Sequence, residues 1–99
     1  MQPLQTIAEL QTLVCHKPIV VVEIGSIRCC ACSAIAQKLS ARYKDDPLVA
    51  CASLSLEAAA DTCAALGIYS APAVLVYVQG KLTIRFLLVF GMGNKSTST

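Results

Sequence analysis

The chain has 99 residues, of which 56% are hydrophobic and 14% charged, and its formal net charge is +2. This length suits one domain with a single core, and the small, scattered positive charge argues against a nucleic-acid-binding surface. No apolar run reaches the roughly 18 residues that a membrane-spanning helix needs, so the hydropathy favours a buried sheet over a membrane segment.

The amino-terminal residues lack the charged, then apolar, then small-residue pattern of a signal peptide, so we expect a cytoplasmic protein. Six cysteines in a short chain would form a disulfide framework only in a secreted setting. Four of them lie among apolar or small residues and are expected to be small core residues: Cys15, Cys30, Cys51 and Cys63.

The first predicted element is a short amphipathic helix that begins after Thr6 and ends at about Cys15. Thr6 and Glu9 have the spacing of a capping box, and Pro18 stops the helix soon after Cys15. A run of β-branched residues at 19–24 then predicts a buried strand.

Later elements follow from similar signals. Ser55 is a plausible N-cap and Gly67 a C-cap for an alanine-rich helix between them, and Gln79-Gly80 is typical of a hairpin turn. In chain order we expect a helix at 30–43, a strand at 48–54, a helix at 56–66, a strand at 73–78 and a strand from 81 to about 90.

This order predicts an α/β fold. The two strands separated by a helix should be parallel neighbours, and the last two form an antiparallel hairpin. The result is a mixed four-stranded sheet with flanking helices. We assign residues 1–91 to this domain and expect residues 92–99, which show no periodicity, to be a disordered tail.

The chemistry of the chain is concentrated where the strand at 19–24 leads into Cys29 and Cys32. This Cys-x-x-Cys lies at the predicted start of a helix, where unpaired N–H groups and the helix dipole stabilise a thiolate. Arg28 adds a permanent positive charge beside Cys29 in the sequence. These features predict redox chemistry at Cys29.

Over roughly residues 18–91 the chain resembles the thioredoxin family. Three features carry the resemblance, in the family's order: a strand that leads into Cys-x-x-Cys at a helix start, the segment 67–73 (GIYSAPA), and a strand-turn-strand at 74–86 with Gly80 in the turn. The resemblance implies a thioredoxin-like sheet and a protein-disulfide reductase with no cofactor. Its partners would be protein disulfide substrates and an upstream reductase, in electron transport for cell redox homeostasis.

The resemblance also implies a role for individual residues. Cys29 matches the nucleophile that attacks a substrate disulfide, and Cys32 matches the resolving thiol. Glu23 matches the buried acid that assists proton transfer at the resolving thiol. Pro72 matches the cis-proline, and the backbone at Ala71 would pair with the substrate. Arg28 is expected to be exposed and to touch or steer substrates.

The chain departs from the family pattern at several places. Arg28 replaces the usual Trp, and Cys30-Ala31 replaces the usual Gly-Pro between the two cysteines. The family's first strand is expected to be missing before Thr6, and its last helix has no counterpart after Phe90. An uncovered sheet face would result, which predicts a dimer or a partner contact there.

Three other functions remain open from the residues. Cys29, Cys30 and Cys32 could bind zinc or copper(I) as thiolates, although no second cysteine pair or histidine pair completes a four-ligand site. The chain could be a non-catalytic binding module on this fold. It could also be a single-thiol enzyme that uses glutathione, but no glutathione pocket is evident in the sequence.

Overall fold

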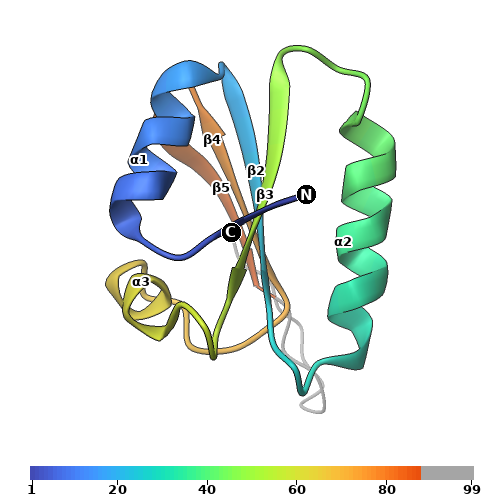
Figure 1. Cartoon of the computed structure of the whole chain (residues 1–99), viewed down its shortest axis with the longest axis vertical. Helices are drawn as coiled ribbons and strands as arrows, with labels where there is room; N and C mark the ends of the chain where they lie inside the picture. The colour runs from blue at the N-terminus through green and yellow to red at the C-terminus, as the bar shows by residue number, and fades with distance from the viewer. Residues whose placement is uncertain (88–99) are drawn as a thin grey trace.

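The computed structural model describes residues 1–87, which form one mixed five-stranded sheet and three helices (Figure 1). The elements are β1 (Gln2–Leu4), α1 (Ile7–His16), β2 (Ile19–Gly25), α2 (Cys30–Tyr43), β3 (Val49–Ser55), α3 (Ala60–Ala65), β4 (Ala73–Val78) and β5 (Lys81–Leu87). The predicted end of the last strand at 88–90 and the predicted tail at 92–99 lie outside the described residues.

The strand order is β1-β3-β2-β4-β5. The central strand β2 runs parallel to β3 and antiparallel to β4, and β5 is antiparallel to β4, as the order of elements predicted. The predicted α/β class and the bounds of α2 are confirmed.

The prediction of four strands, with the first strand missing, is wrong. Residues Gln2–Leu4 form β1, which pairs in parallel with β3 at the edge of the sheet. Three residues are too short to show a period-2 pattern, and Pro3 argues against a strand except at an edge. The strand forms because Leu4, only 3% exposed, reaches the core.

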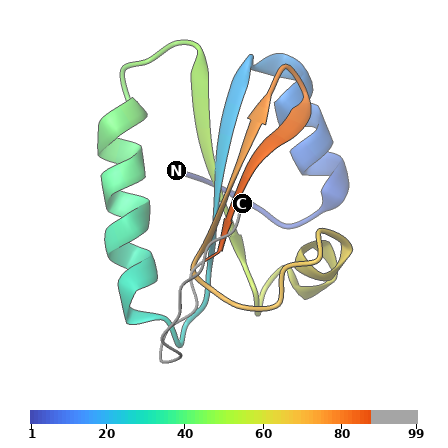
Figure 2. The ribbon, with the colours of Figure 1, turned by 180° about the vertical axis from the view of Figure 1, so that it is seen from behind.

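The three helices divide between the two faces of the sheet. Figures 1 and 2 show α1 and α3 on one face and α2 alone on the other. The main core fills the space between the sheet and α1 and α3. Its largest fully buried side chains include Val20, Val22, Ile24, Leu54, Ile68 and Leu75. Because β2 is covered on both faces, its sequence is apolar without alternation.

The second face is only partly covered. Helix α2 packs on β3 and β2. On the same side of β4 and β5, Ile84 is 52% exposed and Phe86 47% exposed, next to half-buried Val74 and Val76. Within residues 1–87 no helix covers this patch. The dimer predicted through it stays a prediction, and the segment in which the last helix was expected to be missing lies outside the described residues.

Helix α3 is shorter than predicted. It begins at Ala60, and residues 56–59 form turns in which the Ser55 hydroxyl accepts a hydrogen bond from the Ala58 N–H (3.1 Å). Ser55 therefore caps a turn that precedes the helix. The turns place Ala59 in the core and Glu57 at the surface.

The end of α3 is as predicted. Gly67 has φ +74°, and the N–H groups of Gly67 and Ile68 donate to the carbonyls of Ala64 and Cys63 (2.9 Å each). This pair of bonds is a Schellman motif, which uses glycine because an L side chain is strained at that φ. It turns the chain toward Pro72.

Two of the four cysteines expected in the core are not there. Cys63 is buried and Cys51 half-buried, but Cys15 and Cys30 are exposed. Cys15 lies on the outer side of α1, and Cys30 is the first residue of α2, so small neighbours in the sequence did not indicate burial. Among the described residues, no helix is long and apolar enough to cross a membrane.

Candidate active site

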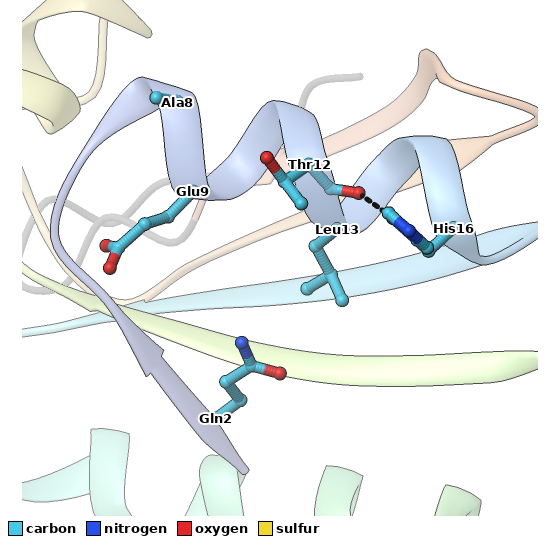
Figure 3. A pocket seen from close by; sticks show the side chains of 6 residues that line it. All are labelled: Gln2, Ala8, Glu9, Thr12, Leu13 and His16. Atoms are coloured by element: carbon cyan, nitrogen blue, oxygen red, sulfur yellow. Dashed lines mark hydrogen bonds between the residues drawn. The ribbon is translucent and has the colours of Figure 1, made fainter.

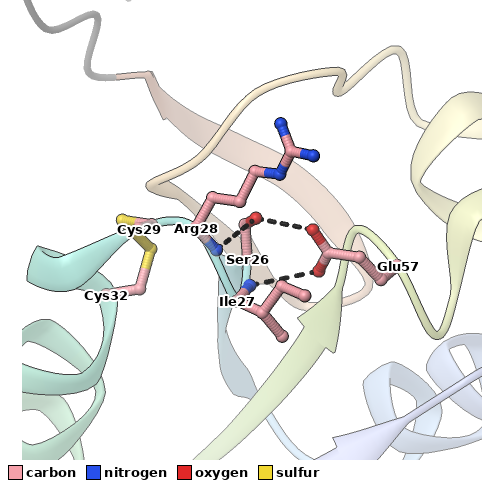
Figure 4. Close-up of a disulfide and its surroundings, with 6 residues drawn as sticks. All are labelled: Ser26, Ile27, Arg28, Cys29, Cys32 and Glu57. Atoms are coloured by element: carbon pink, nitrogen blue, oxygen red, sulfur yellow. Dashed lines mark hydrogen bonds between the residues drawn. A yellow bond between two sulfur atoms is a disulfide. The ribbon is translucent and has the colours of Figure 1, made fainter.

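Cys29 and Cys32 form a disulfide at the start of α2 (Figure 4). Their Cα atoms are 5.5 Å apart, within the usual range for a disulfide. Cys29 is the N-cap residue of the helix, its N–H donates to the Ser26 carbonyl (3.0 Å), and its own carbonyl accepts from the Cys32 N–H (3.2 Å). The two cysteines thus lie where β2 leads into α2, within the first turn of the helix.

The two cysteines differ in their exposure to solvent. Cys29 is half-buried, whereas Cys32 is only 6% exposed. A substrate can therefore reach Cys29 first. At the N-cap position a Cys29 thiolate would lie next to unpaired helix N–H groups and the positive end of the helix dipole, which favour the anion.

Arg28 is exposed, and in Figure 4 its side chain extends away from the two sulfur atoms. The structure therefore does not place the guanidinium on Cys29. Its position at the rim of the site is consistent with contact to a substrate rather than to the thiol.

Glu23 lies on β2, on the α2 side of the sheet. It is 3% exposed, its Oε2 atom has no hydrogen-bond partner, and burial raises its pKa to about 7. Gly25 brings this carboxyl group close to Cys32. A Cβ atom on Gly25 would lie 3.3 Å from Cys32 Cβ and 3.4 Å from Glu23 Oε2, so both side chains pack against the same glycine.

A pocket of about 330 Å³ lies over this pair. Its lining includes Glu23, Cys32, Ser26 and Ser53. The pocket is open to solvent, so a buried carboxyl group next to the disulfide has a path for proton exchange with water. These positions can therefore hold and move a proton beside Cys32.

The Ala71–Pro72 peptide bond is cis. Pro72 is buried, and Ala71 is half-buried and lines a groove of about 550 Å³ together with Cys29 and Arg28. Two apolar side chains also line this groove, Ile27 (84% exposed) and Tyr69 (77% exposed). The structure thus brings Cys29, Arg28 and Ala71 around one groove. Cys32 and Glu23 instead line the neighbouring pocket of about 330 Å³.

The sequence analysis did not identify Glu57 as part of this site. Its carboxylate accepts hydrogen bonds from the Ser26 hydroxyl (2.6 Å) and the Ile27 N–H (3.2 Å), as Figure 4 shows. It also accepts one from the Ser55 hydroxyl (3.3 Å). These bonds, with the Ser26 hydroxyl contributing most, hold the pKa of Glu57 below its usual range. From the sequence, Glu57 is expected only to be an acidic residue in the first turn of the predicted helix at 56–66, and no local pattern links it to Cys29.

Arg85 is a second residue that the sequence did not single out. From β5 its guanidinium donates to the carbonyls of Leu66 and Gly67 (3.0 Å each). These bonds fix the end of α3, from which the chain runs to Tyr69 and Pro72. Arg85 therefore supports one wall of the groove without lining it.

Other polar clusters have structural explanations. A pocket of about 440 Å³ beside α1 is lined by Gln2, Ala8, Glu9, Thr12, Leu13 and His16 (Figure 3). Glu9 is occupied in the capping box, and His16 Nδ1 donates to the Thr12 carbonyl (2.7 Å). Over residues 1–87 no group of three or more His, Cys, Asp or Glu side chains is arranged to hold a metal ion.

No protein-family model and no curated protein sequence matches the chain. Its structure, however, is similar to solved thioredoxins. It resembles a thioredoxin from Fasciola hepatica (TM-score 0.79, 28% identity, covering 88% of this chain and 86% of that one). It also resembles oxidised mitochondrial thioredoxin 3 from Saccharomyces cerevisiae (TM-score 0.79, 15% identity, 88% and 82%) and oxidised thioredoxin from Plasmodium falciparum (TM-score 0.76, 17% identity, 88% and 84%).

Proposed function

We propose that this chain, a thioredoxin-like protein by its fold and its Cys29–Cys32 disulfide, is a thiol–disulfide oxidoreductase that reduces disulfides in proteins. The observation that carries the proposal is the placement of that disulfide at the N-terminus of α2, in the groove that Ala71 also lines. A disulfide that only stabilised the fold would not need a cysteine in a groove with exposed apolar side chains, whereas a redox disulfide needs one that a substrate can reach.

The first step would use the dithiol form. The Cys29 thiolate attacks one sulfur of the substrate disulfide, the substrate S–S bond breaks, and the other substrate sulfur leaves as a thiolate. A mixed disulfide between Cys29 and the substrate results. Cys29 suits this role because it is the more accessible cysteine and because the helix N-terminus stabilises its thiolate.

In the second step Cys32 would give its proton to the Glu23 carboxylate and attack the Cys29 sulfur. The mixed disulfide breaks, the Cys29–Cys32 bond forms, and the substrate leaves with its second thiol. The substrate gains two electrons and the protein loses two. A pKa of about 7 suits Glu23 to accept and return a proton near neutral pH.

The groove supports a protein as the substrate. Ile27 and Tyr69 expose apolar surface on its walls, and Arg28 adds a positive charge at the rim. An extended segment of the substrate would lie along Ala71 and Pro72. An upstream reductase would return electrons to Cys29 and Cys32, and a cytoplasmic location would suit this direction because the cytosol keeps thiols reduced.

Cysteine variants test the proposal. We expect Cys29→Ser to abolish reduction of a disulfide-containing protein, because no thiolate remains at the accessible position. Cys32→Ser should accumulate mixed disulfides, visible by mass under non-reducing conditions. Cys30→Ser is the matched control, because Cys30 is exposed and adjacent but outside the disulfide, and it should keep its activity. Undiminished turnover by the Cys29 variant would overturn the assignment.

A redox titration against glutathione distinguishes the alternatives. A reversible two-electron couple near the thioredoxin value of about −270 mV supports a reductase, and a much higher potential indicates an oxidant or isomerase. If Cys29 and Cys32 never pair in solution, the enzyme proposal fails, and a binding module or a thiolate metal site replaces it.

A further inference from the structure

We propose that Glu57 is a positioning residue of this site: its carboxylate holds the loop that carries Cys29, and its charge disfavours the Cys29 thiolate. The inference rests on the proposed redox function and adds a residue from outside the Cys-x-x-Cys segment. It concerns the reduction potential of the Cys29–Cys32 pair and the rate at which the protein reduces a substrate.

The holding role follows from the hydrogen bonds. The loop from Ser26 to Arg28 is the only covalent link between the end of β2 and Cys29, and Glu57 accepts from both the Ser26 hydroxyl (2.6 Å) and the Ile27 N–H (3.2 Å). The Ser26 oxygen in turn accepts from the Arg28 N–H (3.1 Å). One carboxylate therefore fixes the whole loop.

Glu57 itself is firmly anchored. Strands β2 and β3 are parallel neighbours, and Gly25 and Ser55 at their ends are partners in the register. Beyond this pair the Leu56 N–H donates to the Gly25 carbonyl (2.9 Å), and the Ser55 hydroxyl donates to Glu57 (3.3 Å). The carboxylate thus extends the pairing of β2 and β3 past the ends of the strands, up to the residue before Cys29.

The charge of Glu57 acts on one neighbouring thiol, that of Cys63. It contributes to raising the pKa of Cys63, after the larger effect of burial. Glu57 and Cys29 line the same groove. Reduction of the disulfide creates a thiolate at Cys29, and a negative neighbour makes that anion less stable. A less stable reduced form means a stronger reductant.

Two variants separate the charge from the hydrogen bonds. Glu57→Gln removes the charge, but its amide oxygen can still accept from the Ile27 N–H and its NH₂ group can donate to the Ser26 oxygen. Glu57→Ala removes both. The control is Asp61→Asn, which removes an exposed charge from the first turn of α3 and, among the described residues, breaks no side-chain hydrogen bond.

We expect both Glu57 variants to shift the equilibrium with glutathione about threefold toward the dithiol form, or about 14 mV, and to lower the pKa of Cys29 measured by alkylation rate against pH. The Glu57→Ala variant should also lose about tenfold in kcat/KM for a protein disulfide, because the loop no longer holds Cys29 in place. Glu57→Gln should keep most of its kcat/KM, and Asp61→Asn should match the wild type in all three measurements.

If both Glu57 variants have the same glutathione equilibrium, Cys29 pKa and kcat/KM as the wild type, the inference is overturned and the proposed function is left intact. If the wild type itself shows no reversible two-electron couple, the proposed function fails, and the inference fails with it. Thermal unfolding shows whether Glu57→Ala folds, and the Glu57→Gln result decides the charge effect if it does not.

Discussion

At the scale of single residues, Glu23 has the most unusual environment of the site. A carboxyl group inside an apolar strand costs free energy when it is charged, and no cation among residues 1–87 forms an ion pair with it. Its pKa is therefore raised from 4.5 to about 7. The same property that suits Glu23 to proton transfer makes the folded protein sensitive to pH.

The sign of that sensitivity follows from linkage. Between pH 4.5 and about 7 the folded protein keeps the Glu23 proton and the unfolded chain has lost it, so the contribution of Glu23 to stability is fully present below pH 4.5 and lost as the pH rises to about 7. A raised pKa of this size corresponds to a loss on the order of 3 kcal/mol.

Glu23→Gln should remove this pH dependence. In the oxidised protein we expect the variant to be more stable than the wild type at pH 8 by about 1–3 kcal/mol, and to have no such advantage at pH 4. Urea unfolding of both proteins at the two pH values measures this. A difference that does not change with pH would show that the Glu23 carboxyl titrates normally.

At the scale of elements, the site depends on how α3 ends. Gly67 closes the helix with φ +74°, and Arg85 from β5 binds the carbonyls of Leu66 and Gly67. The backbone then runs to Ala71 and Pro72. A helix cap and a side chain from a distant strand together set the position of the groove wall opposite Cys29.

Gly67→Ala tests this arrangement, and Gly80→Ala is its matched control. Both glycines have positive φ, so each alanine is strained and costs about 1 kcal/mol. The new Cβ at Gly67 would also lie 3.2 Å from Arg85 Nη2, whereas nothing lies within 4 Å at Gly80. We therefore expect Gly67→Ala to lose more unfolding free energy than Gly80→Ala. Only Gly67→Ala should also raise the KM for a protein disulfide. Equal effects would mean that the Arg85 contact is unimportant.

At the scale of the whole molecule, the two faces of the sheet contribute unequally to stability. The face under α1 and α3 holds the main core, while the β4 and β5 part of the other face exposes Ile84 and Phe86. The free energy of folding should therefore come mainly from the first face. The redox site lies at one end of the sheet, where β2 meets α2, and does not depend on covering the second face.

Alanine substitutions on the β4–β5 hairpin measure this asymmetry. Leu75 is 1% exposed and Ile84 52% exposed, and they lie on opposite faces of the hairpin. We expect Leu75→Ala to reduce the unfolding free energy by about 2–5 kcal/mol and Ile84→Ala by less than about 1 kcal/mol. A large loss for Ile84→Ala in denaturant titrations would indicate that its side chain is buried in solution, by another part of the chain or by a partner.

The sequence by itself determined the features that local physical chemistry specifies. The β-branched run predicted β2, the helical spacing after Cys29 predicted α2, and Gly67 predicted the end of α3. Each of these signals acts within a few residues, so it is present in the chain before folding. The order of strands and helices then allowed few topologies.

Only the tertiary structure decided the features that need distant residues to meet. The bond between Ser26 and Glu57 joins residues 31 positions apart, and that between Arg85 and Gly67 joins residues 18 apart. No local pattern marks such a partner. The short strand β1 forms for the same kind of reason, because β3 offers it an edge. The sequence indicated Cys29, Cys32 and a buried Glu23, but the contacts of Glu57 depend on packing between distant residues, which no short stretch of sequence contains.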